Sequence, residues 1–147
     1  MYAALKTALA TALRNNSPLA ALLASATAIY YRRPPRERAL PCLIYLVEDQ
    51  PQPALSGCDH TRVHLTISIW SASGGTNDAI LVALDAAVLA AHQSGALAPS
   101  GWRVALCRRA DARIAGEDRL RDGDPVATAD AAVERRDTHW ILDLVKL

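Results

Sequence analysis

The chain has 147 residues, of which 51% are hydrophobic, and its net charge is +1 at pH 7. This length and composition fit one domain with one packed core and exclude a disordered segment, and the near-neutral charge excludes a global attraction to nucleic acid or membranes. The three cysteines are odd in number and widely spaced, so we expect no disulfide framework and a reducing compartment. We expect no signal peptide, because the N-terminus has only Lys6 and no basic region followed by an uninterrupted apolar stretch. We expect no membrane partner, because no apolar run approaches the roughly 18–20 residues of a membrane-spanning helix.

Two short helices and a brief strand are predicted to open the chain. Leucines recur every four residues across 2–14, which predicts an alanine-rich amphipathic helix. Ser17 and Pro18 then predict the N-cap and the first position of a second short helix. Residues 28–31 predict a brief strand that ends at an exposed loop over 32–38, the Arg/Pro loop, because proline removes a backbone donor.

Two neighbouring strands follow this loop. The apolar run over 42–47 predicts a central strand that is covered on both faces. The segment 48–58 contains two prolines and a glycine, so it predicts a connection. Over 61–70, apolar side chains alternate with Arg62, His64, Thr66, Ser68 and Trp70, which predicts a half-buried strand. The short connection predicts that the two strands pair antiparallel.

A third helix is predicted over 79–91, with Gly95 as its C-cap. Its predicted buried stripe consists of Ile80, Leu84, Val88 and Ala91. A strand is predicted over 102–108, with Val104 and Leu106 on one face.

The remaining segments complete the predicted fold. The polar stretch 110–124 predicts a loop or arm, and alternation around Trp140 predicts a last long strand over 133–147. The order of elements predicts an α+β fold: an antiparallel or mixed β-sheet of about four to five strands with helices packed mainly on one face. We expect a single domain over 1–147 with extended loops near 48–58 and 110–132.

Candidate ligand sites are weak in this sequence. Cys58, His60 and His64 have even spacing and could share a strand face, but a zinc site needs three or four ligands and a fourth is not evident. The turn Gly74–Thr76 lacks the spacing of a phosphate-binding loop, so we interpret it as a plain turn with Thr76 or Asn77 as the helix cap. We therefore expect neither a metal nor a cofactor.

Motifs for catalysis are also lacking. Ser56, Ser71 and Cys107 have no nucleophile motif around them, and neither His92 nor His139 can be assigned to them as a base by spacing. The arginine clusters could contact phosphates, although solvated loops are the more common outcome for such clusters.

Several segments carry a family resemblance when they are taken as a set. They are the leucine-rich helices followed by Ala-Ile-Tyr-Tyr, the strand Leu40–Tyr45 after an Arg/Pro loop, the strand Thr61–Trp70, the alanine-rich helix from Asp78 and the late strand around Trp140. With them the chain resembles the tail-completion or tail-terminator proteins of long-tailed bacteriophages, prophages and gene transfer agents. It differs from many of these relatives in its longer, more charged segment 110–132.

The resemblance implies a structural virion protein and not an enzyme. Such a protein forms a ring, commonly of six subunits, that caps the tail tube, stops its polymerisation and joins the tail to the head connector. The implied partners are other copies of the chain, the tail tube protein and a connector or neck protein, with DNA passing through the lumen without sequence-specific contact. The implied location is the tail–neck junction of the virion, with assembly in the host cytoplasm.

We expect the interfaces of such a ring on the segments 48–58 and 110–124, on the Arg/Pro loop and on the polar face of the strand 61–70. Each single residue there could equally belong to a solvated surface. The candidate interface residues are Arg32, Arg33, Arg36, Arg38, Arg62, His64, Thr66, Ser68, Arg113, Arg119 and Arg121. Three alternatives remain: a neck or connector adaptor, a small DNA-binding module with salt-sensitive affinity, and an enzyme with titratable groups converging in a pocket.

Overall fold

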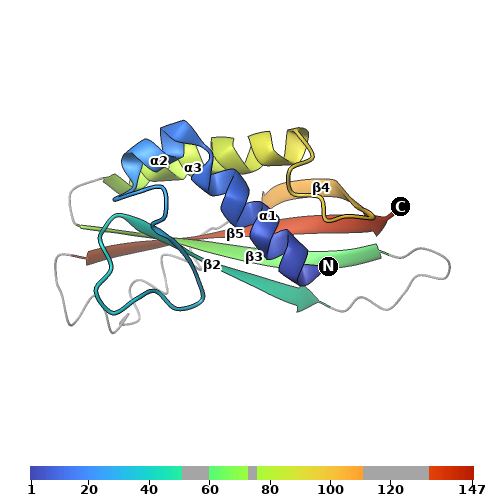
Figure 1. The fold of residues 1–147 in the computed structure, drawn as a ribbon, viewed down its shortest axis with the longest axis horizontal. Coiled ribbons are helices and arrows are strands. Elements are labelled where there is room, and N and C mark those ends of the chain that lie inside the picture. Colours follow the sequence, from blue (N-terminus) through green and yellow to red (C-terminus); the bar gives the residue numbers. More distant parts are fainter. Residues whose placement is uncertain (51–59, 73–75, 111–132) are drawn as a thin grey trace.

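The computed structural model describes residues 1–50, 60–72, 76–110 and 133–147. In this part of the chain, three helices cover one face of a five-stranded mixed sheet (Figure 1), which confirms the predicted α+β class. The elements are α1 (Tyr2–Arg14), α2 (Ser17–Leu22), β1 (Ile29–Tyr31), β2 (Cys42–Gln50), β3 (His60–Ala72), α3 (Thr76–Gln93), β4 (Trp102–Ala110) and β5 (Val133–Lys146).

The strands lie in the order β1-β2-β3-β5-β4, with β1 parallel to β2 and the other neighbours antiparallel. The predicted antiparallel pairing of β2 with β3 is confirmed and runs from Cys42 opposite Trp70 to Gln50 opposite Arg62. Residues 48–50 therefore belong to β2 and not to a connection as predicted, because they find backbone partners on β3. The rest of that predicted loop and most of the 110–132 segment lie outside the described residues.

The N-terminal helices follow their predictions except at one cap. Asn16, and not Ser17, is the N-cap of α2: its side-chain oxygen accepts a hydrogen bond from the Leu19 backbone N–H at 3.1 Å. Asn16 has the extended backbone of a cap residue, which makes Ser17 the first helical residue and Pro18 the second. Proline is well tolerated in this first turn, because its missing N–H has no helical acceptor there.

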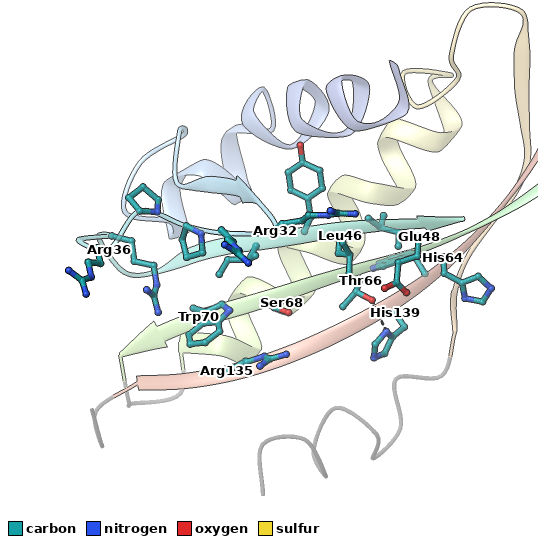
Figure 2. Close-up of a pocket in the computed structure, with 18 residues that line it drawn as sticks. Arg32, Arg36, Leu46, Glu48, His64, Thr66, Ser68, Trp70, Arg135 and His139 are labelled. Atoms are coloured by element: carbon teal, nitrogen blue, oxygen red, sulfur yellow. Dashed lines mark hydrogen bonds between the residues drawn. The ribbon is translucent and has the colours of Figure 1, made fainter. Parts of the chain in front are cut away.

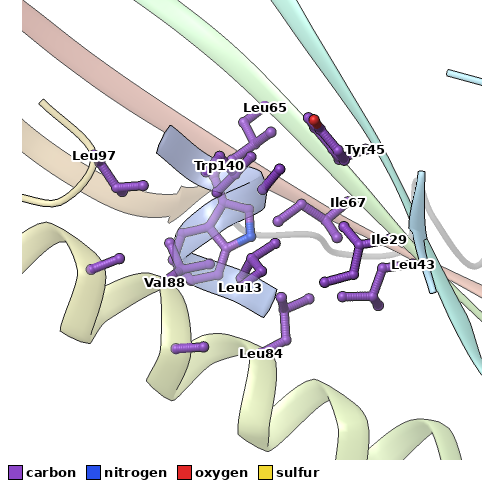
Figure 3. Close-up of a cluster of buried hydrophobic side chains, with 14 of the residues drawn as sticks. Leu13, Ile29, Leu43, Tyr45, Leu65, Ile67, Leu84, Val88, Leu97 and Trp140 are labelled. Carbon is purple, nitrogen blue, oxygen red and sulfur yellow. The ribbon is translucent and has the colours of Figure 1, made fainter. Parts of the chain in front are cut away.

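The core lies between the helices and the covered face of the sheet (Figure 3). Leu13 of α1, Leu84 and Val88 of α3, and Ile67 of β3 are fully buried in it, and Trp140 of β5 is 2% exposed. The predicted buried stripe of α3 is confirmed, and Gly95 follows this helix with φ +76°, the left-handed conformation for which glycine is suited.

One face of β2 is open, contrary to the prediction that this strand is covered on both sides. Leu43, Tyr45 and Val47 are buried in the core, whereas Ile44 and Leu46 are half-buried on the other face. The reason is that α1, α2 and α3 all pack on the same side of the sheet (Figure 1).

A register shift in β4 corrects a second prediction. Val104 is 8% exposed, but Leu106 is 41% exposed and the next inward side chain is Cys107 at 8%. An irregularity between Val104 and Leu106 places them opposite Leu144 and Asp143, which are adjacent on β5. Such a bulge inserts one residue and shifts the later side chains to the other face.

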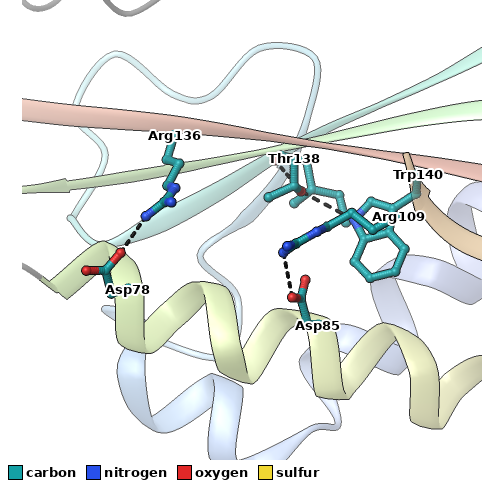
Figure 4. A network of polar contacts seen from close by, with 7 residues as sticks. Asp78, Asp85, Arg109, Arg136, Thr138 and Trp140 are labelled. Atoms are coloured by element: carbon teal, nitrogen blue, oxygen red, sulfur yellow. Dashed lines mark hydrogen bonds and ion pairs between the residues drawn. The ribbon is translucent and has the colours of Figure 1, made fainter. Parts of the chain in front are cut away.

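Two ion pairs hold α3 to the sheet (Figure 4). Arg109 of β4 donates to Asp85 at 2.5 Å, and Arg136 of β5 donates to Asp78. These pairs are partly exposed, so each adds at most about 1 kcal/mol of stability, and the apolar core supplies most of the attachment.

Candidate functional site

The polar face of β3 lies opposite the helices, as its alternating sequence predicted. The register places Leu46 of β2 and His139 of β5 on either side of Thr66, and Ile44 and Asp137 on either side of Ser68. This open face therefore combines apolar side chains from β2 with polar side chains from β3 and β5.

The Arg/Pro loop encloses part of the open face and forms a groove with a volume of about 850 Å³ (Figure 2). The loop brings arginines to one wall, while strands β2, β3 and β5 provide the floor and the other wall. The lining side chains with polar or large apolar character include Arg32, Arg33, Arg36, Arg38, Ile44, Leu46, Glu48, His64, Thr66, Ser68, Trp70, Arg135 and His139. The groove thus gathers seven of the eleven candidate interface residues.

Trp70 links the Arg/Pro loop to the sheet through contacts with two arginines. Its ring is 7% exposed and lies between two guanidinium groups, with Arg38 of the loop 4.9 Å and Arg135 of β5 5.4 Å from the ring centroid. Both distances are within the range of a cation–π attraction, which is strongest for tryptophan. The same Arg38 guanidinium lies beside Cys42, although burial is the larger effect and raises the pKa of that thiol.

A buried carboxylate organises the floor beside Trp70. Asp137 is 3% exposed and accepts hydrogen bonds from Arg135 Nε at 2.8 Å and Arg135 Nη2 at 3.0 Å. Its Oδ1 also accepts a hydrogen bond from the Ser68 hydroxyl at 2.6 Å. This arrangement neutralises Arg135 and leaves the loop arginines as the source of the groove's positive charge.

Arg62 shares the strand face but lies outside the groove lining. Its guanidinium forms a two-point contact with Asp143 of β5, with Nε–Oδ1 at 2.7 Å and Nη2–Oδ2 at 3.0 Å. His60 Nε2 lies 3.8 Å from the same carboxylate. Hydrogen bonding from Arg62 is the main cause that holds the pKa of Asp143 below its ordinary value of 3.8, against a smaller opposing effect of burial.

We predict that the Arg62–Asp143 pair makes the free energy of unfolding depend on pH in the acidic range. Because the pKa of Asp143 is lower in the folded than in the unfolded state, its contribution is present above about pH 4 and is lost as the pH falls through the folded-state pKa. Urea unfolding at about pH 5 and about pH 3 should show a smaller loss of unfolding free energy for Asp143→Asn than for the wild type. Glu134→Gln, at an exposed site on the same strand, is the control. Equal acid dependence of the wild type and Asp143→Asn would contradict the assignment.

The candidate metal ligands that the structure describes form no cluster, and Ser56, a candidate nucleophile, lies outside the described residues. Within the ranges that the structure describes, no three histidine, cysteine or acidic side chains are grouped as a metal site. Cys58 lies outside those ranges. Cys107 is buried, which raises the pKa of its thiol to about 11 and keeps the thiolate scarce at neutral pH.

The start of α3 differs from its prediction. Thr76 and Asn77 are the first two residues of α3, so neither is its N-cap. The buried Asn77 side chain instead accepts a hydrogen bond from Ser71 at 2.5 Å, because β3 ends directly beside the start of the helix. No helix in the described ranges is long and apolar enough to cross a membrane.

The sequence did not predict two residues of the site, and three of the predicted residues lie outside the described ranges. Arg135 and Asp137 were missed because the pairing of β3 with β5 joins positions nearly seventy residues apart. The only sequence signal was their alternation on a predicted strand. Arg113, Arg119 and Arg121 lie outside the described residues, so their proposed contact role stays a prediction.

The described residues define a class of fold: an α+β sheet that is covered by helices on one face and carries a groove on the other (Figure 1). The family model described as "Tail completion protein gp17" matches residues 7–136, and the chain therefore belongs to this family. Membership makes it a structural protein of phage-type tails, as the resemblance implied.

The fold is shared with a solved virion protein. A chain of the structure titled "Virion of native gene transfer agent (GTA) particle" superposes with a TM-score of 0.52 at 18% sequence identity. The similarity covers 98% of this chain and 96% of that one. At this identity the likeness shows a common fold. No curated protein sequence matches the chain significantly.

Proposed function

We propose that this chain forms a ring, of about six copies on the family resemblance, that caps the tail tube and ends its polymerisation. The ring joins the tail to the head connector at the tail–neck junction and leaves a lumen through which DNA passes. Its partners are neighbouring copies of itself, the tail tube protein and a connector protein, and it assembles in the host cytoplasm. Family membership over residues 7–136 supports a tail role, and one feature of α3 supports self-association.

The outer face of α3 is apolar although no described element covers it. Val82 is 71% exposed and Leu89, seven residues later on the same side, is 43% exposed. Ala86 lies between them and is also exposed. Because the inner face of α3 is apolar as well, the helix is apolar nearly all round, and such helices are normally buried on every side. A neighbouring copy that packs on this stripe would complete the burial.

In a closed ring the contact between copies is heterologous, so the α3 stripe of one copy packs on a different patch of the next. α3 lies on the side of the sheet opposite the open face (Figure 1). This separation leaves one surface for the neighbouring copy and another for a second protein. The apolar stripe of α3 therefore makes the contact between neighbouring copies.

The test is negative-stain imaging and light scattering of the purified chain, alone and mixed with assembled tail tubes. We expect closed rings, in solution or at one end of the tubes. The substitution Val82→Glu should abolish them, because a carboxylate in a packed apolar contact must lose its hydration. Ser100→Glu adds the same charge at an exposed position outside α3 and should leave the rings intact.

Three outcomes would contradict parts of this proposal. A wild-type chain that forms no ring under either condition would overturn the ring itself. Rings of Val82→Glu as frequent as those of the wild type would overturn the role of α3. Rings that form in solution but never bind to the tubes would favour the neck adaptor alternative.

A further inference from the structure

We propose that the groove on the open face binds an extended, acidic segment of another virion protein. The identity of the partner class rests on the proposed function, whereas the chemistry of the segment rests on the groove. The bound segment carries several carboxylate side chains and at least one apolar side chain.

The charge of the groove favours carboxylates. The described residues that line it include five arginines and a single glutamate, Glu48. Arg135 is neutralised by Asp137, but neither Arg33 nor Arg36 has an ion pair with any residue that the structure describes, and both are exposed. Arginine guanidinium groups match carboxylates through paired hydrogen bonds, so unpaired arginines on one wall are suited to a chain of acidic residues.

The floor of the groove favours a protein segment over duplex DNA. Ile44 and Leu46 are half-buried on the floor, opposite Ser68 and Thr66. The buried ring of Trp70 lies on the same face, further along β3. These groups can bury apolar side chains, which a DNA backbone does not offer. A stiff duplex would bring its phosphates to the rim arginines but would leave the floor uncovered. An extended peptide can reach both the wall and the floor.

Hydrogen bonding in the groove is also incomplete. Trp70 Nε1, Arg38 Nε and His64 Nε2 are buried atoms of lining residues that have no hydrogen-bond partner among the described residues. Buried polar atoms are paired in nearly all folded proteins, because each unpaired one carries a desolvation cost. The first two are donors, and carboxylates are acceptors only. An acidic segment therefore has the hydrogen-bonding character that these groups lack.

The test uses fluorescence anisotropy with the full chain and a labelled nonapeptide, Asp-Glu-Leu repeated three times. Two companion peptides replace three or all six acids with asparagine or glutamine, and a labelled 20-base-pair DNA duplex is the competing probe. We expect the affinity to rise with the number of acids and to fall with added salt. The groove variant Arg33→Glu/Arg36→Glu should lose at least tenfold in affinity.

The matched control is Arg103→Glu/Arg108→Glu, which makes the same change in net charge at exposed positions of β4 outside the groove lining. Its affinity for the peptide should change less than twofold. Equal losses in the two variants would reduce the effect to net charge and overturn the proposal. Equal binding of the acidic and neutral peptides, or no binding of the acidic one, would overturn it as well.

Two further outcomes separate this proposal from its alternatives. Tighter binding of the duplex than of the acidic peptide, with the duplex affinity lost in the groove variant, would replace the acidic segment with DNA. Concentration-dependent self-association that disappears in the groove variant would replace it with a second copy. The ring experiment with Val82→Glu is independent: rings without peptide binding overturn only the groove, and peptide binding without rings overturns only the ring.

Discussion

Trp140→Ala is expected to reduce the free energy of unfolding by about 3–5 kcal/mol, the usual cost of removing a large aromatic side chain from a core. Trp140 is 2% exposed and lies between the sheet and the helices (Figure 3). Its indole N–H donates to the Thr138 hydroxyl at 3.3 Å, which in turn donates to the Ile67 carbonyl oxygen at 2.9 Å. The substitution removes the ring from the core together with the first of these bonds. Urea unfolding, with the midpoint and slope fitted separately, measures the loss.

Two further variants keep this test interpretable. Trp140→Phe retains a ring and should lose about half as much stability, which covers the case in which the alanine variant does not fold. Leu147→Ala, at a site that is 83% exposed and outside the α3 stripe, should change the free energy of unfolding by less than about 0.5 kcal/mol. A loss below about 1 kcal/mol for Trp140→Ala would show that this residue does not anchor the core.

Asp137→Ala is expected to cost about 2–3 kcal/mol, because hydrogen bonds to a charged group are among the stronger ones in a fold. The substitution removes the acceptor of Arg135 and leaves the Ser68 hydroxyl, on a side chain 7% exposed, without the bond it donates to Asp137. Thermal and urea unfolding measure the loss. Asp137→Asn keeps an acceptor for Ser68 but not the charge, so it should recover part of the stability.

A double-mutant cycle apportions this effect. Ser68→Ala alone should cost less than Asp137→Ala, and the double variant should cost less than the sum of the two, because the residues share one hydrogen bond. Glu134→Ala removes an exposed acid of β5 and should be nearly neutral. Strict additivity of Ser68→Ala and Asp137→Ala would contradict a coupled network.

The fold was predictable where one periodicity dominates the sequence. The alternation over 61–70 and around Trp140 correctly assigned both central strands and their buried faces. The side assignment of Leu106 was wrong because a bulge leaves no mark in the hydrophobic pattern. The two-sided burial of β2 was wrong because an apolar run does not reveal whether a second layer of helices exists.

The site was predictable only in part. Local sequence identified the loop arginines and the polar face of β3 as candidates, but not the groove that they form together. Trp70 lies between Arg38 and Arg135, which come from segments nearly one hundred residues apart and meet only through the strand order β2-β3-β5. Such contacts depend on topology, and spacing in the sequence carries no signal for them.

The long central pair of strands has a mechanical consequence. β3 and β5 pair over 13 residues, from His60 opposite Val145 to Ala72 opposite Val133, and run along the longest axis of the molecule (Figure 1). At roughly 3.3 Å per residue, this ribbon is about 40 Å long. Its hydrogen bonds are perpendicular to the strands, so a pull along the strands loads all of them together, whereas a sideways pull opens them one after another. The subunit is therefore stiff under tension along β3 and β5 and yields most easily when these strands are peeled apart.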